Sequence, residues 1–171
     1  YLVEKCGRPM TSYIFEGDRS FSLEHIRQEY PVYGTTDYRH PAIEIMQENG
    51  SNISEFKYVG YEILKGKPSL KGLPATYTES EEEAETLKII LKDSLTGAKL
   101  TLLYTIFSKG SAIARSAHIC NEGEKVLHLQ TMMSLNLDLP DKDYVWMQLS
   151  GAWSRERYVK NRILEQGITA I

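Results

Sequence analysis

The residues best suited to contact a ligand lie in the stretch QLSGAWSRERYVKN, residues 148–161. Trp153 follows Gly151 and Ala152 at the end of a strand-like run, and the charged residues of 154–157 come directly after it. Because an indole ring has a large, flat, apolar face, it can stack on the C–H face of a sugar ring or pack against a neighbouring domain. Composition alone leaves both interpretations open.

A second aromatic cluster lies in the stretch EYPVYGTTDYRHPA, which contains Tyr30, Tyr33 and Tyr38. Tyrosine is heavily used in this chain, with 11 residues in 171. Aromatic faces combined with the charges of Asp37 and Arg39 suit sugar hydroxyls. The competing interpretation, which the prolines favour, is a rigid loop whose shape is held by pairing of Asp37 with Arg39.

The residues that could catalyse a reaction do not form a recognisable set. Hydrolysis of a glycosidic bond needs two carboxylates at a fixed separation, but the carboxylates here fall mostly in predicted turns and in the acidic run of residues 79–86. No nucleophile elbow, P-loop, GxGxxG or HExxH motif occurs. His118 and His128 fall on predicted strands, where a surface or half-buried histidine is more common than a catalytic base. The sequence therefore predicts no self-contained catalytic centre.

The cysteines give little reason to expect a metal site or a redox function. Cys6 and Cys120 are the only two and lie far apart, which favours reduced thiols, although their pairing stays open. They and the four histidines have no zinc-ligand spacing. We expect no metal and no cofactor.

Charge and hydropathy exclude two classes of partner. With 20 basic and 23 acidic residues, the net charge of -3 gives no electrostatic basis for binding nucleic acid. No apolar run approaches the roughly 20 residues of a membrane-spanning helix, so we expect no membrane association. The two lone cysteines favour a cytoplasmic location. The chain begins at Tyr1 rather than at methionine, which suggests a piece of a longer protein.

The elements that must position these residues are predicted to be strands. Apolar and polar residues alternate in runs separated by turn signals, and only residues 22–30 have a short helical pattern. Residues 66–77 contain two prolines and two glycines and predict a surface excursion, and the acidic run 79–86 is interpreted as a solvated charged segment. The pattern predicts an all-β fold, a large antiparallel β-sandwich forming one domain over residues 1–171. The predicted strands are residues 42–47, 53–65 with a bulge at Gly60, 87–92, 100–106, 113–120, 126–139 and 144–149.

Several long runs carry a family resemblance: FSLEHIRQEYPVYGTTDYRHPAIEIMQENGS, YEILKGKPSLKGLPATY, EAETLKIILKDSLTGAKLTLLYTIF and LDLPDKDYVWMQLSGAWSRERYV. They resemble the N-terminal region of bacterial α-galactosidases of glycoside hydrolase family 36, over residues 13–171. The resemblance implies a β-supersandwich, galactose-mutarotase-like, that precedes a catalytic (β/α)8 barrel and a small C-terminal β domain. It also implies hydrolysis, with retention, of terminal α-1,6-linked galactose in oligosaccharides such as melibiose and raffinose. The family's catalytic aspartates lie in the barrel, so the present chain is expected to be inactive alone.

The resemblance also implies which residues contact substrate. Trp153 matches the tryptophan of the family's GAW motif beside the galactose site, and Arg19 matches an arginine that lines the pocket in some members. The acidic residue that accompanies that arginine has no counterpart here, since its place falls near Gly7. Many members are tetramers, so the implied protein partners are the chain's own barrel and neighbouring subunits. Residues 155–157 are then expected to anchor the strand end to the barrel rather than to touch sugar.

Two other functions stay open from the residues alone. A stand-alone carbohydrate-binding module would use Trp153 as its stacking platform. A purely structural or interaction β-sandwich would use its exposed aromatic residues to hold subunits together.

Overall fold

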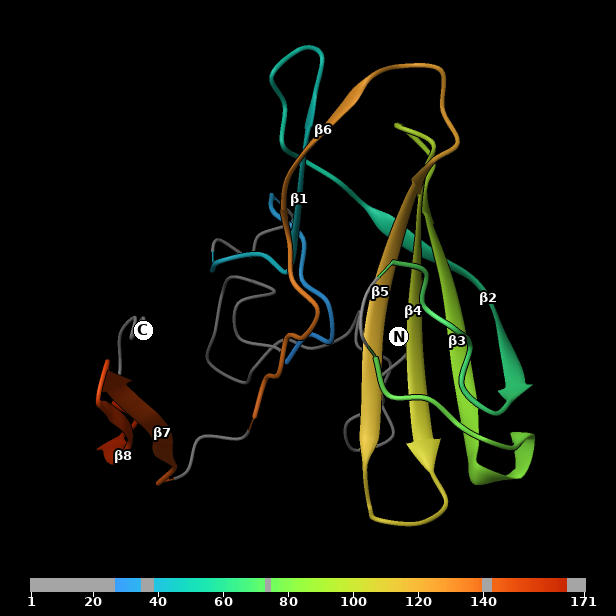
Figure 1. The fold of residues 1–171 in the computed structure, drawn as a ribbon. Helices are drawn as coiled ribbons and strands as arrows, with labels where there is room; N and C mark the ends of the chain where they lie inside the picture. Colours follow the sequence, from blue (N-terminus) through green and yellow to red (C-terminus); the bar gives the residue numbers. More distant parts are fainter. Residues whose placement is uncertain (1–26, 35–38, 73–74, 140–142, 166–171) are drawn as a thin grey trace, which may run out of the picture. The chain divides into compact units, whose positions relative to one another are not determined.

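The computed structural model describes residues 27–34, 39–72, 75–139 and 143–165, and within them the regular secondary structure is β-strand apart from one 3-10 turn (Figure 1). The all-β, antiparallel prediction is confirmed. Two compact units are found, a sandwich unit that ends at Asp138 and a hairpin unit that begins at Leu139. The assignment of residues 1–171 to one domain stays a prediction. The strands are β1 Ile43–Gln47, β2 Phe56–Lys65, β3 Ala84–Asp93, β4 Ala98–Phe107, β5 Ile113–Asn121, β6 Leu127–Met132, β7 Val145–Ala152 and β8 Arg155–Ile163.

Most of the predicted strands are present, and the differences are instructive. The bulge expected at Gly60 is found, because the β2–β3 register shifts between Tyr58 and Gly60. The predicted strand over residues 126–139 is too long, since β6 ends at Met132. Strand β8 was missed, and residues 27–30 of the predicted helix are not helical. In the described residues no helix is a candidate membrane span.

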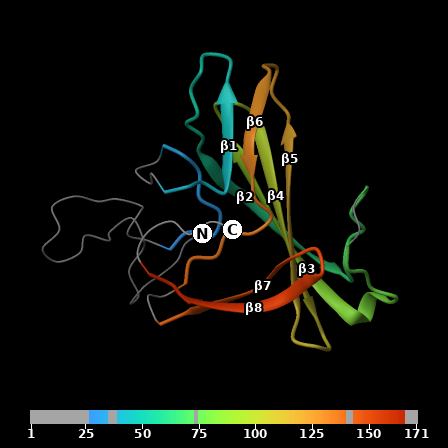
Figure 2. The same ribbon diagram turned by 60° about the vertical axis from the view of Figure 1, so that its left-hand side comes forward.

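The larger layer of the sandwich unit is a four-stranded antiparallel sheet in the order β2-β3-β4-β5 (Figures 1 and 2). Successive side chains of a strand point to opposite faces, so residues paired across the sheet form rows on one face. One row joins Leu91, Leu100 and Ile119, and the next joins Ile89, Leu102 and Ala117. We call this face the inner face, since the core lies on it.

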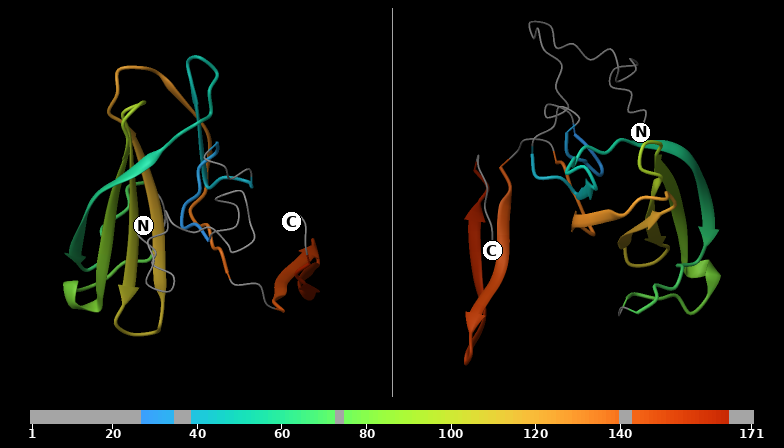
Figure 3. Two further views of the ribbon diagram at one scale, coloured as in Figure 1. Left: turned by 180° about the vertical axis from the view of Figure 1, so that it is seen from behind. Right: turned by 90° about the horizontal axis from the view of Figure 1, so that it is seen from above.

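The smaller layer is the antiparallel pair β1–β6, which packs on the inner face beside β4 and β5 (Figures 2 and 3). Ile43 and Ile45 of β1 are buried together with Leu91, Leu100 and Leu102. Each buried aliphatic side chain of this size contributes about 1.5–3 kcal/mol by leaving water. This shared cluster is what joins the two layers.

Next to the β1–β6 pair, irregular segments at residues 27–30 and 133–136 lie on the inner face and are held there by polar side chains. Arg115 of β5 contacts the Glu29 carboxylate at 2.7 Å and donates to the Asn136 carbonyl at 2.8 Å. The Tyr104 hydroxyl donates to the same Glu29 carboxylate at 2.9 Å, and Tyr30 donates to the Met133 carbonyl at 2.5 Å. These side-chain hydrogen bonds hold residues 133–136 in place, beyond the end of strand β6 at Met132.

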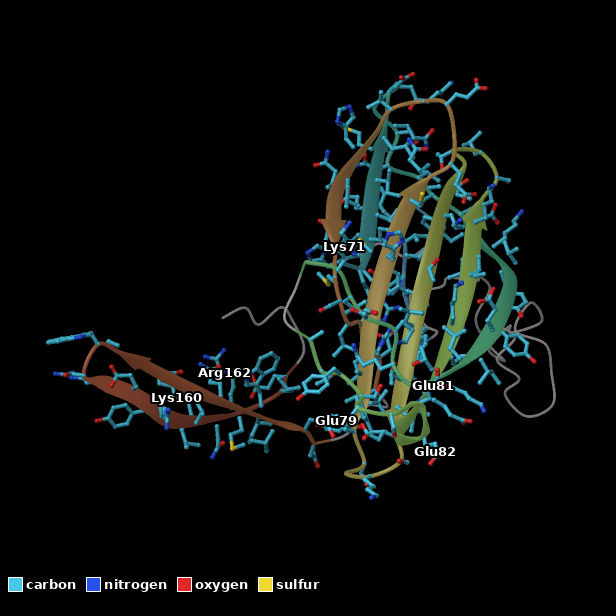
Figure 4. All side chains as sticks on the ribbon, turned by 45° about the vertical axis from the view of Figure 1, so that its right-hand side comes forward. Lys71, Glu79, Glu81, Glu82, Lys160 and Arg162 are labelled. Atoms are coloured by element: carbon cyan, nitrogen blue, oxygen red, sulfur yellow. The ribbon has the colours of Figure 1, made fainter. Side chains whose placement is uncertain are left out.

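The acidic run at the base of this sheet is only partly a solvated segment. Glu81 and Glu82 form an exposed 3-10 turn at one end of the sheet (Figure 4). Strand β3 begins within the run, and Ala84 and Thr86 are buried. Thr86 donates to the Gly66 carbonyl at 2.7 Å and shares a 2.7 Å hydrogen bond with the Thr105 hydroxyl, so both hydroxyl groups are satisfied.

Candidate functional site

The candidate site is the tip of the β7–β8 hairpin, and these two strands are the regular secondary structure in the described part of the hairpin unit (Figure 3). The two strands pair from Val145 opposite Ile163 to Ala152 opposite Arg155, so Trp153 and Ser154 form a two-residue connection. Ser154 has a φ of 62°, a left-handed conformation that glycine or asparagine adopts more readily. The strand after this turn was missed in the sequence because Trp-Ser lacks the usual glycine signal of a tight hairpin.

A β-bulge next to the tip depends on Gly151. The β7–β8 register shifts between Ser150 and Ala152, so that Gly151 of β7 lies opposite two residues of β8, Glu156 and Arg157. A Cβ atom at Gly151 would lie 2.1 Å from the Arg155 carbonyl oxygen and 2.8 Å from the Glu156 Cα. A side chain at residue 151 would therefore clash with the backbone of β8, and the close approach of β7 to β8 requires glycine at this position.

Trp153 is 91% exposed, so the indole is neither core packing nor covered by the hairpin itself. Glu156 of β8 stabilises the turn, because its carboxylate accepts a 2.8 Å hydrogen bond from the Ser154 backbone N–H. Residues 155–157 are exposed and begin strand β8. Trp153 is therefore a free aromatic face on a backbone-defined turn, which is the geometry needed to stack on a ligand.

The two faces of the hairpin differ in chemistry. Val145, Met147 and Leu149 of β7 share one face with Val159 and Ile163 of β8. The opposite face carries Lys160 and Arg162, which are labelled on the hairpin in Figure 4, together with Tyr158, Trp146, Gln148 and Ser150. The cationic residues thus form a charged side of the same ribbon that ends in Trp153.

The tyrosine-rich stretch does not form a free aromatic surface in its described part. Tyr30 is partly buried against the core, and burial raises the pKa of its hydroxyl above the ordinary value while the nearby Arg115 charge opposes that shift. Arg39 forms an ion pair with Asp138 at 3.4 Å. Asp37 and Tyr38 lie outside the described residues, so the predicted Asp37–Arg39 pair stays a prediction. The structure favours the rigid-loop interpretation for Tyr30.

The remaining predicted site residues are placed as follows. Arg19 and Cys6 lie outside the described residues. Cys120 carries a free thiol on β5. His118 and His128 are exposed on β5 and β6, in agreement with the strand prediction. Among the described residues, no group of three histidine, cysteine, aspartate or glutamate side chains could hold a metal ion.

Comparison with known proteins decides the family. A family model described as the glycosyl hydrolase family 36 N-terminal domain matches residues 6–171. This chain belongs to glycoside hydrolase family 36. Alpha-galactosidase AgaA of Geobacillus stearothermophilus is 49% identical over 153 residues, which are 90% of this chain and 21% of that enzyme. Alpha-galactosidase Mel36A of Lactobacillus acidophilus is 38% identical over 151 residues, again 21% of that enzyme.

Solved structures of the family agree with the fold. The crystal structure of AgaA matches 94% of this chain with a TM-score of 0.85 and 47% identity, and the match covers 22% of the AgaA chain. Crystal structures of AgaA variants in complex with raffinose and with stachyose match with the same TM-score. The chain therefore corresponds to the N-terminal domain of family 36 and spans about a fifth of the length of its relatives.

Proposed function

We propose that this chain is the N-terminal, non-catalytic part of a retaining α-galactosidase that releases terminal α-1,6-linked galactose from oligosaccharides such as melibiose and raffinose. Family membership supports this function, as do the two relatives named α-galactosidase and the related structures crystallised with galactose-containing oligosaccharides. The reacting carboxylates belong to the remainder of the enzyme.

The role of this domain is to supply one wall of the galactose pocket. The observation that carries this proposal is Trp153, a 91% exposed indole at the tip of a hairpin whose turn is fixed by Gly151 and Glu156. Stacking of an aromatic ring on the apolar face of galactose adds binding energy without taking part in bond cleavage. Arg19 is proposed as a second pocket residue, donating charge-assisted hydrogen bonds to sugar hydroxyls.

The division of labour is tested by assaying hydrolysis of an aryl α-galactoside. The purified 171-residue chain is expected to show no turnover, and the full-length enzyme that contains it is expected to be active. Turnover by the 171-residue chain alone would refute the non-catalytic role. An inactive full-length enzyme would refute the α-galactosidase assignment.

The role of Trp153 is tested in the full-length enzyme with Trp153→Ala and Trp153→Phe. Loss of the ring should raise KM for raffinose about tenfold, and phenylalanine should restore much of the affinity because it keeps an aromatic face. Trp146→Phe, on the same hairpin but away from the tip, is the matched control and should leave KM unchanged. An unchanged KM for Trp153→Ala would remove the indole from the pocket.

We further propose that the full-length enzyme is a cytoplasmic homotetramer in which this domain supports subunit association. The free Cys120 thiol supports a reducing compartment. Sedimentation of the full-length enzyme gives the oligomeric state directly, and a strictly monomeric enzyme would refute this part.

A stand-alone carbohydrate-binding module is the second candidate, since the exposed Trp153 serves that function equally well. Half of a pocket leaves most of a sugar in water, so we expect calorimetric titration of the 171-residue chain with galactose to show no binding. Millimolar or tighter binding that disappears in Trp153→Ala would favour the module instead.

A further inference from the structure

The turn at the tip of the β7–β8 hairpin has a backbone conformation that suits tryptophan better than it suits strand pairing. Of its two residues, Ser154 has a positive φ of 62° and Trp153 does not. This is the sign pattern of a type II turn, whereas the type I′ and II′ turns that usually close such hairpins need a positive φ at the first residue. Because a bulky residue rarely adopts a positive φ, Trp153 at the first position disfavours both usual turns.

Unfavourable backbone conformations are concentrated around this turn. Arg157 has a positive φ of 64°, and together with Ser154 it makes two of the three non-glycine residues with positive φ among those that the structure describes. Arg157 lies in the bulge opposite Gly151. A type II turn splays paired strands, whereas a bulge adds local right-handed twist. The bulge therefore allows β7 and β8 to pair next to a turn that fits their twist poorly.

Glu156 holds the peptide group that follows the indole residue. Its carboxylate accepts a 2.8 Å hydrogen bond from the Ser154 backbone N–H, which belongs to the peptide bond between Trp153 and Ser154. The orientation of this central peptide is what distinguishes a type II turn from a type I turn. In the type I orientation the same N–H would point to the other side of the turn, so the hydrogen bond to Glu156 favours the orientation that the structure shows.

The direction of the indole depends on that peptide group. Trp153 is 91% exposed, so packing against other described residues does little to orient its ring. The rotamers that a side chain can adopt depend on its own φ and ψ, and the peptide held by Glu156 sets the ψ of Trp153. Glu156 can therefore act on the indole through the backbone.

We propose that Glu156 is a positioning residue for galactose binding, which keeps the peptide after Trp153 in one orientation and so presents the indole to the sugar in one direction. This inference rests on the proposed function, since it requires Trp153 to form a wall of the galactose pocket. An indole that is already oriented loses less conformational freedom when the sugar binds. The effect falls on substrate affinity rather than on bond cleavage, because Glu156 does not touch the reacting atoms.

The test compares Glu156→Ala with Glu156→Gln in the full-length enzyme. Loss of the acceptor in Glu156→Ala should raise KM for raffinose about fivefold and leave kcat unchanged. Glu156→Gln keeps a carbonyl oxygen that can accept the same N–H, so its KM should stay close to that of the wild type. Glu165→Ala, at an exposed glutamate beyond the end of β8, is the matched control and should change neither constant. An unchanged KM in Glu156→Ala, or an equal rise in Glu156→Gln, would overturn the proposal.

A double variant separates positioning from direct contact with the sugar. If Glu156 acts only through the indole, Trp153→Ala combined with Glu156→Ala should have the same KM as Trp153→Ala alone. A further rise in KM would mean that Glu156 binds substrate itself, and the proposal would be wrong.

A crystal structure of the full-length Glu156→Ala enzyme gives a readout that does not depend on substrate. The indole of Trp153 should leave its wild-type direction, and an unmoved indole, or a variant that does not fold, would overturn the proposal. If Trp153→Ala itself leaves KM unchanged, the proposed pocket wall is wrong and this role of Glu156 is wrong with it. A raised KM in Trp153→Ala with an unchanged KM in Glu156→Ala refutes the role of Glu156 alone.

Discussion

The sandwich unit and the hairpin unit are both antiparallel β-structure, yet they are stabilised in different ways. In the sandwich unit, Leu100 and Leu102 are almost completely buried and join two layers. In the hairpin unit, every residue of β8 is exposed, and among the residues that the structure describes the two strands are joined by backbone pairing. Because an isolated two-stranded hairpin is marginally stable in water, the two units should respond very differently to the same substitution.

The side chains of the two units also differ in what they do. Side chains on the sandwich unit are used mainly to pack, and its polar residues hold irregular chain in place, as Arg115 does for residues 133–136. The hairpin unit presents Trp153 on a short turn with little packing around it. A residue that must contact a ligand needs a defined backbone and a free side chain, and Trp153 at the hairpin tip has both.

The largest effect is expected from a matched pair of leucine truncations in the 171-residue chain. Leu100→Ala removes a side chain that is 1% exposed and should lower the free energy of unfolding by about 3 kcal/mol, from lost burial and the cavity left behind. Leu149→Ala, at a 64% exposed position of β7, should cost well under ~1 kcal/mol. Urea denaturation measures both, and similar losses would contradict the contrast between the two units.

A smaller effect is expected from Arg115→Met, which leaves the Glu29 carboxylate and the Asn136 carbonyl without this partner. The loss should be about 2 kcal/mol, because Arg115 is mostly buried but Glu29 remains partly solvated. Arg162→Met, on the exposed hairpin, is the control and should be neutral. A neutral Arg115→Met would mean that residues 133–136 are held without the guanidinium group.

Gly151→Ala should act on the hairpin alone. The added Cβ lies 2.1 Å from the Arg155 carbonyl oxygen, so the bulge must open, at a cost of about 1–2 kcal/mol. Hydrogen exchange should become faster across β7 and β8, while the amides of β3 and β4 keep their protection. Gly60→Ala is the control, since a Cβ there meets no atom within 4 Å. Unchanged exchange in β7 and β8 would refute the requirement for glycine at the bulge.

The smallest effect is expected at the surface charge cluster of the sandwich unit. Hydrogen bonds from Lys99 and then from Lys92 hold the pKa of the Glu122 carboxylate below its ordinary value. A lowered folded-state pKa means that the stabilisation is present above the ordinary glutamate pKa of 4.5 and is lost as the pH falls through the folded value. Glu122→Gln should therefore reduce stability slightly at pH 7 and not at all in strong acid, and salt should diminish the difference. A difference that grows on acidification would contradict this assignment.

Much of the sandwich unit could be predicted from residue alternation. The runs that became β1, β3, β4 and β5 alternate clearly, and the turn signals between them place their ends to within about three residues, the largest difference being the start of β3 at Ala84. Residues 133–139 also alternate, as in MSLNLDL, and were therefore predicted to extend β6. The structure shows that Asn136 and Asp138 instead bond to side chains and backbone of distant segments, a choice that local sequence does not encode.

At the candidate site, sequence reasoning identified the residue but not its setting. Trp153 was selected for its residue type and for its family resemblance, and its exposure was uncertain. The residue type of Gly151 did not show that it lies in a bulge where two backbones approach closely, as it does in the structure. That difference could not be predicted without strand β8, whose first residues read as a charged segment.

The sequence by itself determined most of the strands, the family and the tryptophan of the candidate site, because alternation, turn residues and long matching runs are local properties of the chain. Only the tertiary structure decided which apolar residues are buried. Ile63 and Ile89 fit the same alternating pattern, yet Ile89 packs against the core and Ile63 remains open, because burial depends on which segment of the chain lies opposite.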